Sequence, residues 1–323
     1  MANEERLTIP IMGTFFNTPN CTNLDELSAD VAFLGAPQEL GKVLRNLSGQ
    51  RWAPQAIRDQ RRYYYYTGRE DDPKRPGSQL AVGRFNPDTG VEDLKGVTMA
   101  DCGDVNILPT DGMANFDRIT KVVKKILNRG AFPVVIGGDH ATTFPVVRAF
   151  DKYQSLDIVQ FDAHLDFSDE FEGVKIFEGS PIKRSSELPF VRNITQIGLE
   201  LVRSKEPFLL AQEYGVKIIT AEKFREIGVD EVVNSIPQAE NIYITIDIDV
   251  LASSVAPGTG TPAIAGLTYL ELKRALTGIT KRGRVVGFDI CEVDPFVDIN
   301  NVTSRVSAEL MLHLLAAIFP PKG

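Results

Sequence analysis

The sequence contains few of the residues that disulfide scaffolds and thiolate metal sites require. Its 323 residues include only 3 cysteines, Cys21, Cys102 and Cys291. They lie far apart, match no zinc spacing and leave one cysteine unpaired in any disulfide scheme. A Gly-x-Ser-x-Gly motif is missing as well, and no histidine signature accompanies the cysteines. The sequence therefore gives no support for nucleophilic catalysis and indicates a reducing compartment.

Long apolar runs are also missing. The longest apolar stretch near the C-terminus, residues 310–319, is interrupted by His313. It has about half of the roughly 20 residues that a membrane span requires. The N-terminal residues do not combine a charged region with an apolar one. We therefore expect no membrane segment, no secretory signal and a cytoplasmic protein.

Positive charge is in short supply. The chain has 35 lysines and arginines against 43 aspartates and glutamates, which gives a formal net charge of −8. Surfaces that bind nucleic acid usually carry a basic excess, so this composition argues against a nucleic-acid partner. Residues 61–66 combine arginines with tyrosines, as single-strand binders do. We interpret this single patch as a helix end and a packed loop.

Short β-branched runs alternate with longer amphipathic stretches along the chain. The runs are almost continuously apolar, which is typical of strands covered on both faces. We expect strands at 31–36, 96–102, 132–138, 156–163, 194–200, 216–220, 241–250 and 284–290. We expect helices at 116–130, 142–153, 206–215, 269–283 and 304–319. Gly130 and Gly283 each follow a basic residue and are predicted to end two of these helices.

This alternation predicts an α/β fold with a mostly parallel, doubly wound sheet and right-handed crossovers. The sequence has no internal repeat, low-complexity tract or linker. We interpret the polar stretch at 67–93 as a long loop region and not as a domain boundary. Residues 1–323 are therefore expected to form a single domain.

Two of the three histidines and several aspartates stand at the ends of predicted strands. They form three clusters: Asp139 and His140; Asp162, His164 and Asp166; and Asp247 and Asp249. Ligands of an α/β sheet bind beyond the carboxyl ends of its strands, so these ends can converge in one crevice. Residues two apart at a strand end point to the same side, so the side chains of a cluster can aim together.

Four of these carboxylates and the two imidazoles suit two borderline-hard divalent ions better than one. A single structural zinc would take four ligands, usually thiolates. Bridging carboxylates could hold two ions roughly 3.5–4 Å apart, with a water between them whose pKa falls towards about 7. A hydrogen-bonded structural pair is the ordinary alternative for any one cluster. Three clusters together favour a binuclear metal site, because so many unneutralised carboxylates would cost several kcal/mol.

These motifs resemble those of the ureohydrolase family, which includes arginases and agmatinases. Gly-Gly-Asp-His, Asp-Ala-His-x-Asp and an Asp-x-Asp-x-Leu motif that leads into Ala-Pro-Gly-Thr-Gly-Thr-Pro occur in that order, within 137–140, 162–166 and 247–262. Three further segments look like those of the family: 49–58, 101–105 and 289–295. The resemblance covers about residues 20–320 and is closest to the agmatinase and guanidino-acid branch. It implies a three-layer α/β/α ureohydrolase fold that usually assembles as trimers or hexamers.

The resemblance also implies a ligand set for two metal ions. One ion would be held by His140, Asp162, Asp166 and Asp247, and the other by His164, Asp162, Asp247 and Asp249. The usual ion of the family is Mn²⁺, while some relatives that act on guanidine or biguanides use Ni²⁺.

The chemistry of a guanidinium explains why such residues are needed. The group is planar, delocalised and cationic, so its carbon is a poor electrophile. Hydrolysis at neutral pH therefore needs a preformed hydroxide to attack this carbon, which a metal pair provides. Glu292 is the candidate that anchors the cation through a charge-assisted hydrogen bond. Asp166 could take up the proton after attack and pass it to the leaving nitrogen.

The sequence departs from the family pattern at several positions. Relatives carry a histidine, thought to shuttle protons, beyond the Asp-Ala-His-x-Asp motif, and Glu178 stands in its place. Glu178 could do acid–base work, bind a second cationic group of the substrate, or mark a subunit with damaged catalysis. Ala252 and Ser253 replace an Asp-Pro pair, and the loop 41–54 is longer than usual. We interpret His313, in the C-terminal helix, as a packing or surface residue.

We therefore interpret the chain as a binuclear metal-dependent hydrolase of C–N bonds in linear amidines. It would split a guanidino compound into urea, or a urea derivative, and an amine. Agmatine-like compounds and ω-guanidino acids are the default substrates, and the missing histidine leaves small or alkylated guanidines and biguanides open. The alternative is a catalytically weak, metal-binding subunit that supports an active paralogue in a hetero-oligomer. Otherwise we expect a homo-oligomer, trimer or hexamer, without a nucleic-acid or membrane partner.

Overall fold

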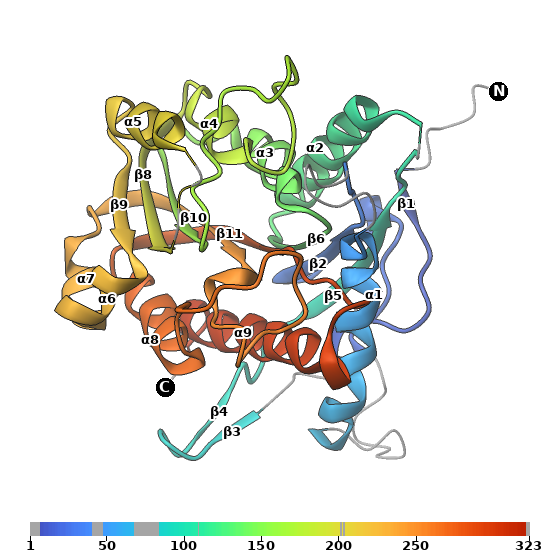
Figure 1. The fold of residues 1–323 in the computed structure, drawn as a ribbon. Coiled ribbons are helices and arrows are strands. Elements are labelled where there is room, and N and C mark those ends of the chain that lie inside the picture. Colours follow the sequence, from blue (N-terminus) through green and yellow to red (C-terminus); the bar gives the residue numbers. More distant parts are fainter. Residues whose placement is uncertain are drawn as a thin grey trace, which may run out of the picture.

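A mostly parallel sheet lies between two layers of helices (Figure 1). The computed structural model describes residues 7–40, 48–67, 84–108, 110–200, 202 and 204–320. Within these residues the strands, in their order across the sheet, are β1 (Thr8–Ile9), β5 (Met99–Val105), β2 (Val31–Ala36), β6 (Phe132–Gly137), β11 (Gly283–Cys291), β10 (Ala239–Asp247), β7 (Leu156–Phe161), β8 (Val191–Leu199) and β9 (Lys217–Thr220). β1 pairs antiparallel with β5, and the other neighbouring strands pair in parallel. The predicted three-layer α/β/α fold is confirmed.

The two helical layers bury opposite faces of the sheet. One layer contains α2 (Gly112–Asn128), α3 (Thr143–Val147), α4 (Pro181–Ser186) and α5 (Lys205–Glu213). The other contains α1 (Ala53–Arg58), α6 (Ala221–Ile227), α7 (Val229–Ser235), α8 (Tyr269–Ile279) and α9 (Val302–Ile318). Successive strand residues alternate between the two cores: Phe33 and Ile244 belong to one, Leu34 and Tyr243 to the other. Apolar runs without polar alternation are therefore what these doubly covered strands require.

Two predictions about helices were wrong in their boundaries. The stretch 142–153 contains only the short α3, flanked by 3-10 turns at His140–Thr142 and Arg148–Phe150, because the chain must then turn to enter β7. Gly130 does follow α2 in the left-handed region, at φ 78°, as predicted. Gly283 does not end a helix, because α8 stops at Ile279 and Gly283 is the first residue of β11.

The predicted loop at 67–93 contains a hairpin that the sequence analysis missed. β3 (Arg84–Asn86) and β4 (Val91–Asp93) pair antiparallel around a turn with Gly90 at φ 73°. Its short strands carry little of the apolar alternation that marks a strand, so periodicity did not indicate it. Residues 68–83 of the same stretch lie outside the described residues, as do residues 41–47 of the loop 41–54.

Four central strands, β6, β11, β10 and β7, place their carboxyl ends side by side, and the candidate residues follow these ends. Gly137, the last residue of β6, and Gly138, which follows it, allow the chain to pass closely over the sheet. A Cβ on Gly138 would lie 1.8 Å from the carbonyl oxygen of Gln38, and a Cβ on Gly137 would lie 2.6 Å from Cys291 Sγ. The backbone that leads into His140 can therefore be packed against both β2 and β11 only with glycine at these positions.

Candidate metal and substrate site

The first group of candidate ligands surrounds His140 and is buried. Its Nδ1 lies 3.1 Å from Asp162 Oδ2, 2.9 Å from Asp166 Oδ2 and 3.5 Å from Asp247 Oδ2. This nitrogen makes no hydrogen bond in good geometry, although its side chain is only 1% exposed. Four ligand atoms that approach one another without bonding to one another fit a set of donors arranged around a cation. We call His140, Asp162 and Asp247 the inner group.

The other ring nitrogen of His140 is held by a chain of buried polar residues. Nε2 lies 2.9 Å from Thr245 Oγ1, which donates to Asp289 Oδ1 at 2.7 Å. The Tyr243 hydroxyl donates to the second oxygen of Asp289 at 2.6 Å. With Thr245 donating to Asp289, its oxygen accepts the Nε2 proton, so Nδ1 is the nitrogen that faces the carboxylates and would bind a metal ion after releasing its own proton. Such an arrangement is common behind histidines that bind metals.

The second group lies nearer the surface. His164 Nδ1 is 3.0 Å from Asp249 Oδ2 and 3.5 Å from Asp162 Oδ1, and the His164 side chain is 31% exposed. Asp249 also accepts hydrogen bonds from Thr261 Oγ1 and from the Ala163 backbone. We call Asp162, His164 and Asp249 the outer group. Because Asp162 contributes one oxygen to each group, the two groups are suited to holding neighbouring ions.

Backbone geometry explains why these side chains meet. Asp247 ends β10 and caps the following 3-10 turn by accepting the Asp249 N–H at 2.8 Å. Asp162 accepts the His164 N–H at 2.6 Å and Gln160 Nε2 at 2.7 Å. Asp166 adopts a left-handed conformation with φ 48°, which brings it back towards His140. The structure therefore brings all six predicted ligands together, and their binding of metal stays a prediction.

The electrostatics of the cluster also call for cations. Burial raises the pKa of Asp247 well above its usual value, and the charges of Asp249 and Asp162 raise it further. Burial and the charge of Asp162 raise the pKa of Asp166 to about 7. Burial lowers the pKa of His164, but Asp249 and Asp162 outweigh it and raise this pKa to about 12. Without metal, protons on these groups hold the carboxylates together, and a divalent ion would replace them.

Glu292 lies beside the inner group and is only 2% exposed. Its Oε1 accepts the His140 backbone N–H at 2.9 Å, and its Oε2 accepts Gln50 Nε2 at 2.9 Å. Glu292 also has a left-handed backbone, with φ 68°, at the point where the chain leaves β11. This position directly behind the metal candidates fits a carboxylate that anchors a cationic substrate.

Glu178 belongs to neither ligand group. Burial raises the pKa of Asp139 well above its usual range, and the charges of Glu292 and Glu178 raise it further, so the Glu178 carboxylate lies within electrostatic range of Asp139. Its side chain is partly buried. Ala252 and Ser253 make backbone hydrogen bonds, in which their N–H groups donate to the carbonyl oxygens of Leu267 and Ala263.

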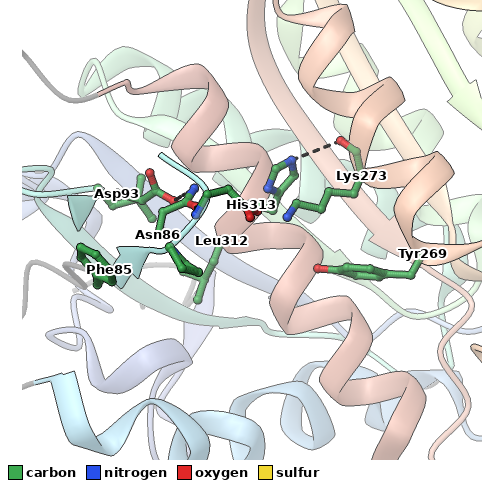
Figure 2. Close-up of a pocket in the computed structure, with 10 residues that line it drawn as sticks. Phe85, Asn86, Asp93, Tyr269, Lys273, Leu312 and His313 are labelled. Atoms are coloured by element: carbon green, nitrogen blue, oxygen red, sulfur yellow. Dashed lines mark hydrogen bonds between the residues drawn. The ribbon is translucent and has the colours of Figure 1, made fainter. Parts of the chain in front are cut away.

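His313 lies elsewhere, as predicted. It projects from α9 into a pocket of about 190 Å³ between α8, α9 and the β3–β4 hairpin (Figure 2). Its Nε2 lies 2.7 Å from Thr277 Oγ1 and 3.2 Å from the carbonyl oxygen of Lys273. These contacts are between neighbouring helices, so His313 is a packing residue in the described part of the chain.

The sequence analysis missed several residues that support this site. They are Gln50, Gln160, Tyr243, Thr245, Thr261 and Asp289. Tyr243, Thr245 and Asp247 follow one face of β10 at every second position, and Thr245 pairs with Asp289 of β11 across the sheet. The alternation of side chains along a strand could have indicated Tyr243 and Thr245. The pairing of Thr245 with Asp289 could not be found in this way, because it depends on the order of the strands in the sheet.

Comparisons with known proteins give one consistent result. A family model described as "Arginase family" matches residues 29–317. Agmatinase of Gallus gallus is 31% identical over 90% of this chain and 81% of its own length. Guanidinopropionase of Pseudomonas aeruginosa is 31% identical over 94% of this chain and 91% of its own. A solved structure of proclavaminate amidino hydrolase from Streptomyces clavuligerus has 27% sequence identity and a TM-score of 0.78 over 96% of this chain and 97% of its own.

None of the helices in the described part of the chain has the length and apolar character that a membrane crossing needs. The family model covers most of the chain, the relatives match it almost from end to end, and the strand ends carry the ligand-type residues described above. We conclude that this chain belongs to the arginase family.

Proposed function

We propose that the chain is a metal-dependent amidinohydrolase that splits a guanidino compound into urea, or a urea derivative, and an amine. The observation that carries this proposal is the pair of ligand groups that share Asp162 beside the buried carboxylate of Glu292. The relatives with this fold are named as hydrolases of agmatine, guanidinopropionate and proclavaminate-type amidines. A metal pair next to an anion that binds cations is the arrangement such a reaction needs.

The donor set fits two divalent ions, Mn²⁺ first and Ni²⁺ as the alternative. His140, Asp162, Asp166 and Asp247 would hold one ion, and His164, Asp162, Asp247 and Asp249 the other. When bound, such ions act as Lewis acids and lower the pKa of water to about 7. Imidazole and carboxylate donors suit these metals, and no thiolate lies among the donors.

The chain's own residues bind and orient the substrate. Glu292 accepts N–H groups of the guanidinium and fixes its plane against the ligand groups. The pKa of a guanidinium is above about 12, so the group is charged at all physiological pH values. Its ion pair with Glu292 is therefore present throughout this range. The buried position of Glu292 strengthens the pair, since little water competes for the same acceptor oxygens.

Asp166 is the proposed proton carrier. Its Oδ2 lies 2.9 Å from His140 Nδ1, and its side chain is 12% exposed, so the carboxylate is next to the ligand groups and partly accessible to solvent. A carboxylate in this position can accept a proton from the attacking water and return it to the leaving nitrogen. Glu178 either assists this transfer or binds a second cationic group.

We also propose that the whole chain forms one domain, because the sheet interleaves distant segments. β2 lies between β5 and β6, and β11 from the C-terminal part lies between β6 and β10. A cut anywhere in the middle of the chain would leave unpaired strands on both sides. A homo-oligomer, trimer or hexamer, in the cytoplasm remains our expectation, and light scattering of the purified protein tests the assembly.

The function is tested by product release from protein loaded separately with Mn²⁺ and Ni²⁺. The substrates are agmatine, arginine, guanidinobutyrate, guanidine, methylguanidine and a biguanide, and the products are urea and free amine. Turnover of at least one compound is the expected result and also identifies the metal. If nothing is hydrolysed while about two ions remain bound per chain, the chain is instead the weak partner of an active paralogue.

A further inference from the structure

Gln50, to which the sequence analysis gave no role, lies directly beside Glu292. It is completely buried, and its Nε2 donates to Glu292 Oε2 at 2.9 Å, although the two residues are 242 positions apart. The His140 backbone N–H donates to the other oxygen of the same carboxylate. One amide therefore bonds directly to the group that we propose as the substrate anchor, while the other donor comes from a candidate metal ligand.

The segment that carries Gln50 is fixed against the turn that carries Glu292. A Cβ on Gly49 would lie 2.4 Å from Asp294 Oδ1 and 2.9 Å from the ring of Phe296, so the Gly49 backbone is in close contact with these two side chains. Gln50 then opens a 3-10 turn in which the Trp52 N–H bonds to the Gly49 carbonyl. The amide of Gln50 consequently has little freedom, and it can hold the Glu292 carboxylate in one orientation.

The hydrogen-bonding capacity of these groups matches a guanidinium. A carboxylate has about four acceptor positions, so in general it can accept protein donors and N–H groups of a bound guanidinium at the same time. The Nε2 of Gln50 points to Glu292, and its Oε1 is buried without a hydrogen-bond partner. An unused buried acceptor beside a cation-binding carboxylate is unfavourable unless a ligand donates to it.

We infer that Gln50 is a positioning and specificity residue for the guanidinium: its Nε2 orients the Glu292 carboxylate, and its Oε1 accepts a further N–H of the same substrate. This inference rests on the proposed function. It assigns the substrate to guanidino compounds that keep several N–H groups around the central carbon. Compounds in which alkyl groups replace these hydrogens, such as N,N-dimethylated guanidines, are expected to bind more weakly.

The test compares Gln50→Met with Gln60→Met. Gln60 is also a buried glutamine whose Nε2 donates within the protein, to the Ala56 carbonyl, and whose Oε1 has no partner. Met keeps the length of the side chain but removes both the donor and the acceptor. For Gln50→Met we expect KM for the best substrate to rise about tenfold or more, with kcat, metal content and Tm close to those of Gln60→Met.

Gln50→Asn serves if Gln50→Met does not fold, because it keeps an amide that is too short to reach Glu292. It should lose the same affinity, and calorimetry of substrate binding to the metal-free variants measures this loss without turnover. An unchanged KM in Gln50→Met or Gln50→Asn, or an equal rise in Gln60→Met, would overturn the inference while the proposed function stands. A wild-type protein that hydrolyses no guanidino compound would instead refute the proposed function, and substrate binding by calorimetry would still separate Gln50 from Gln60.

Discussion

The inner and outer ligand groups are built from the same residue types but differ in their surroundings. His140 of the inner group is 1% exposed and is backed by Thr245, Asp289 and Tyr243. His164 of the outer group is 31% exposed. The inner group is therefore held in place by the core, whereas the outer group is closer to solvent, and we expect a substrate to approach from the outer side. Asp162 joins the two, since it belongs to both.

Removing the shared carboxylate should have the largest effect. In Asp162→Asn both groups lose an anionic ligand, so we expect loss of both ions and a fall in kcat/KM of about a thousandfold or more. Asp157→Asn is the matched control, because Asp157 is buried on the same strand, pairs with Asn193 and lies at the opposite end of β7. An active Asp162→Asn protein without bound metal would refute the site.

The pH dependence of metal binding separates the proton released by His164 from the proton released by Asp166. The pKa of His164 is about 12, so this residue releases a proton to an incoming ion at every accessible pH. The pKa of Asp166 is about 7, so Asp166 releases one more proton below pH 7 but none well above it. Affinity should therefore rise with pH throughout, and its slope should decrease by about one proton per chain on passing pH 7.

Calorimetry in buffers of different ionisation enthalpy, at pH 6 and at pH 8, counts these released protons. An Asp166→Asn variant is the control, since its slope should be the same on both sides of pH 7. If the wild-type protein releases equal numbers of protons at the two values, Asp166 does not change its protonation state between them, which contradicts a pKa of about 7 for this residue.

The polar residues behind His140, which are Thr245, Asp289 and Tyr243, should affect the affinity of the inner group for its ion but not that of the outer group. Tyr243→Phe removes one hydrogen bond to Asp289 and should weaken binding of one ion about tenfold while the other is unaffected. Tyr153→Phe is the control, because both tyrosines contact the ring of Phe150 but only Tyr243 bonds to Asp289. Equal weakening of both ions would mean that the two groups are not distinct in the way described.

Glu178→Gln should have the smallest effect on the metal centre. Glu178 lies in neither ligand group, so metal content should not change, while kcat should fall several-fold if its carboxylate assists proton transfer. Glu172→Gln, an exposed position of the same segment, is the control. A change in KM alone would assign Glu178 to the binding of a second cationic group, and an unchanged kcat would exclude a role in proton transfer.

The sequence predicted those parts of the site that directly follow a recognisable strand. His140, Asp162 and Asp247 follow apolar runs whose ends meet at one edge of the sheet, so their convergence required only the fold class. Glu292 was found through the family resemblance, on a single strand end. Gln50 could not be found in this way, because its contact with Glu292 depends on the packing of Gly49 against Asp294.

The most direct measurement is the number of metal ions bound per chain after saturation with Mn²⁺ and removal of free ion, determined by elemental analysis. Our account predicts about two ions in the wild-type protein, about one in His164→Asn and close to none in Asp162→Asn. A wild-type protein that retains one ion or none at saturation, or a His164→Asn variant that retains two, would contradict the proposal of two ligand groups joined by Asp162.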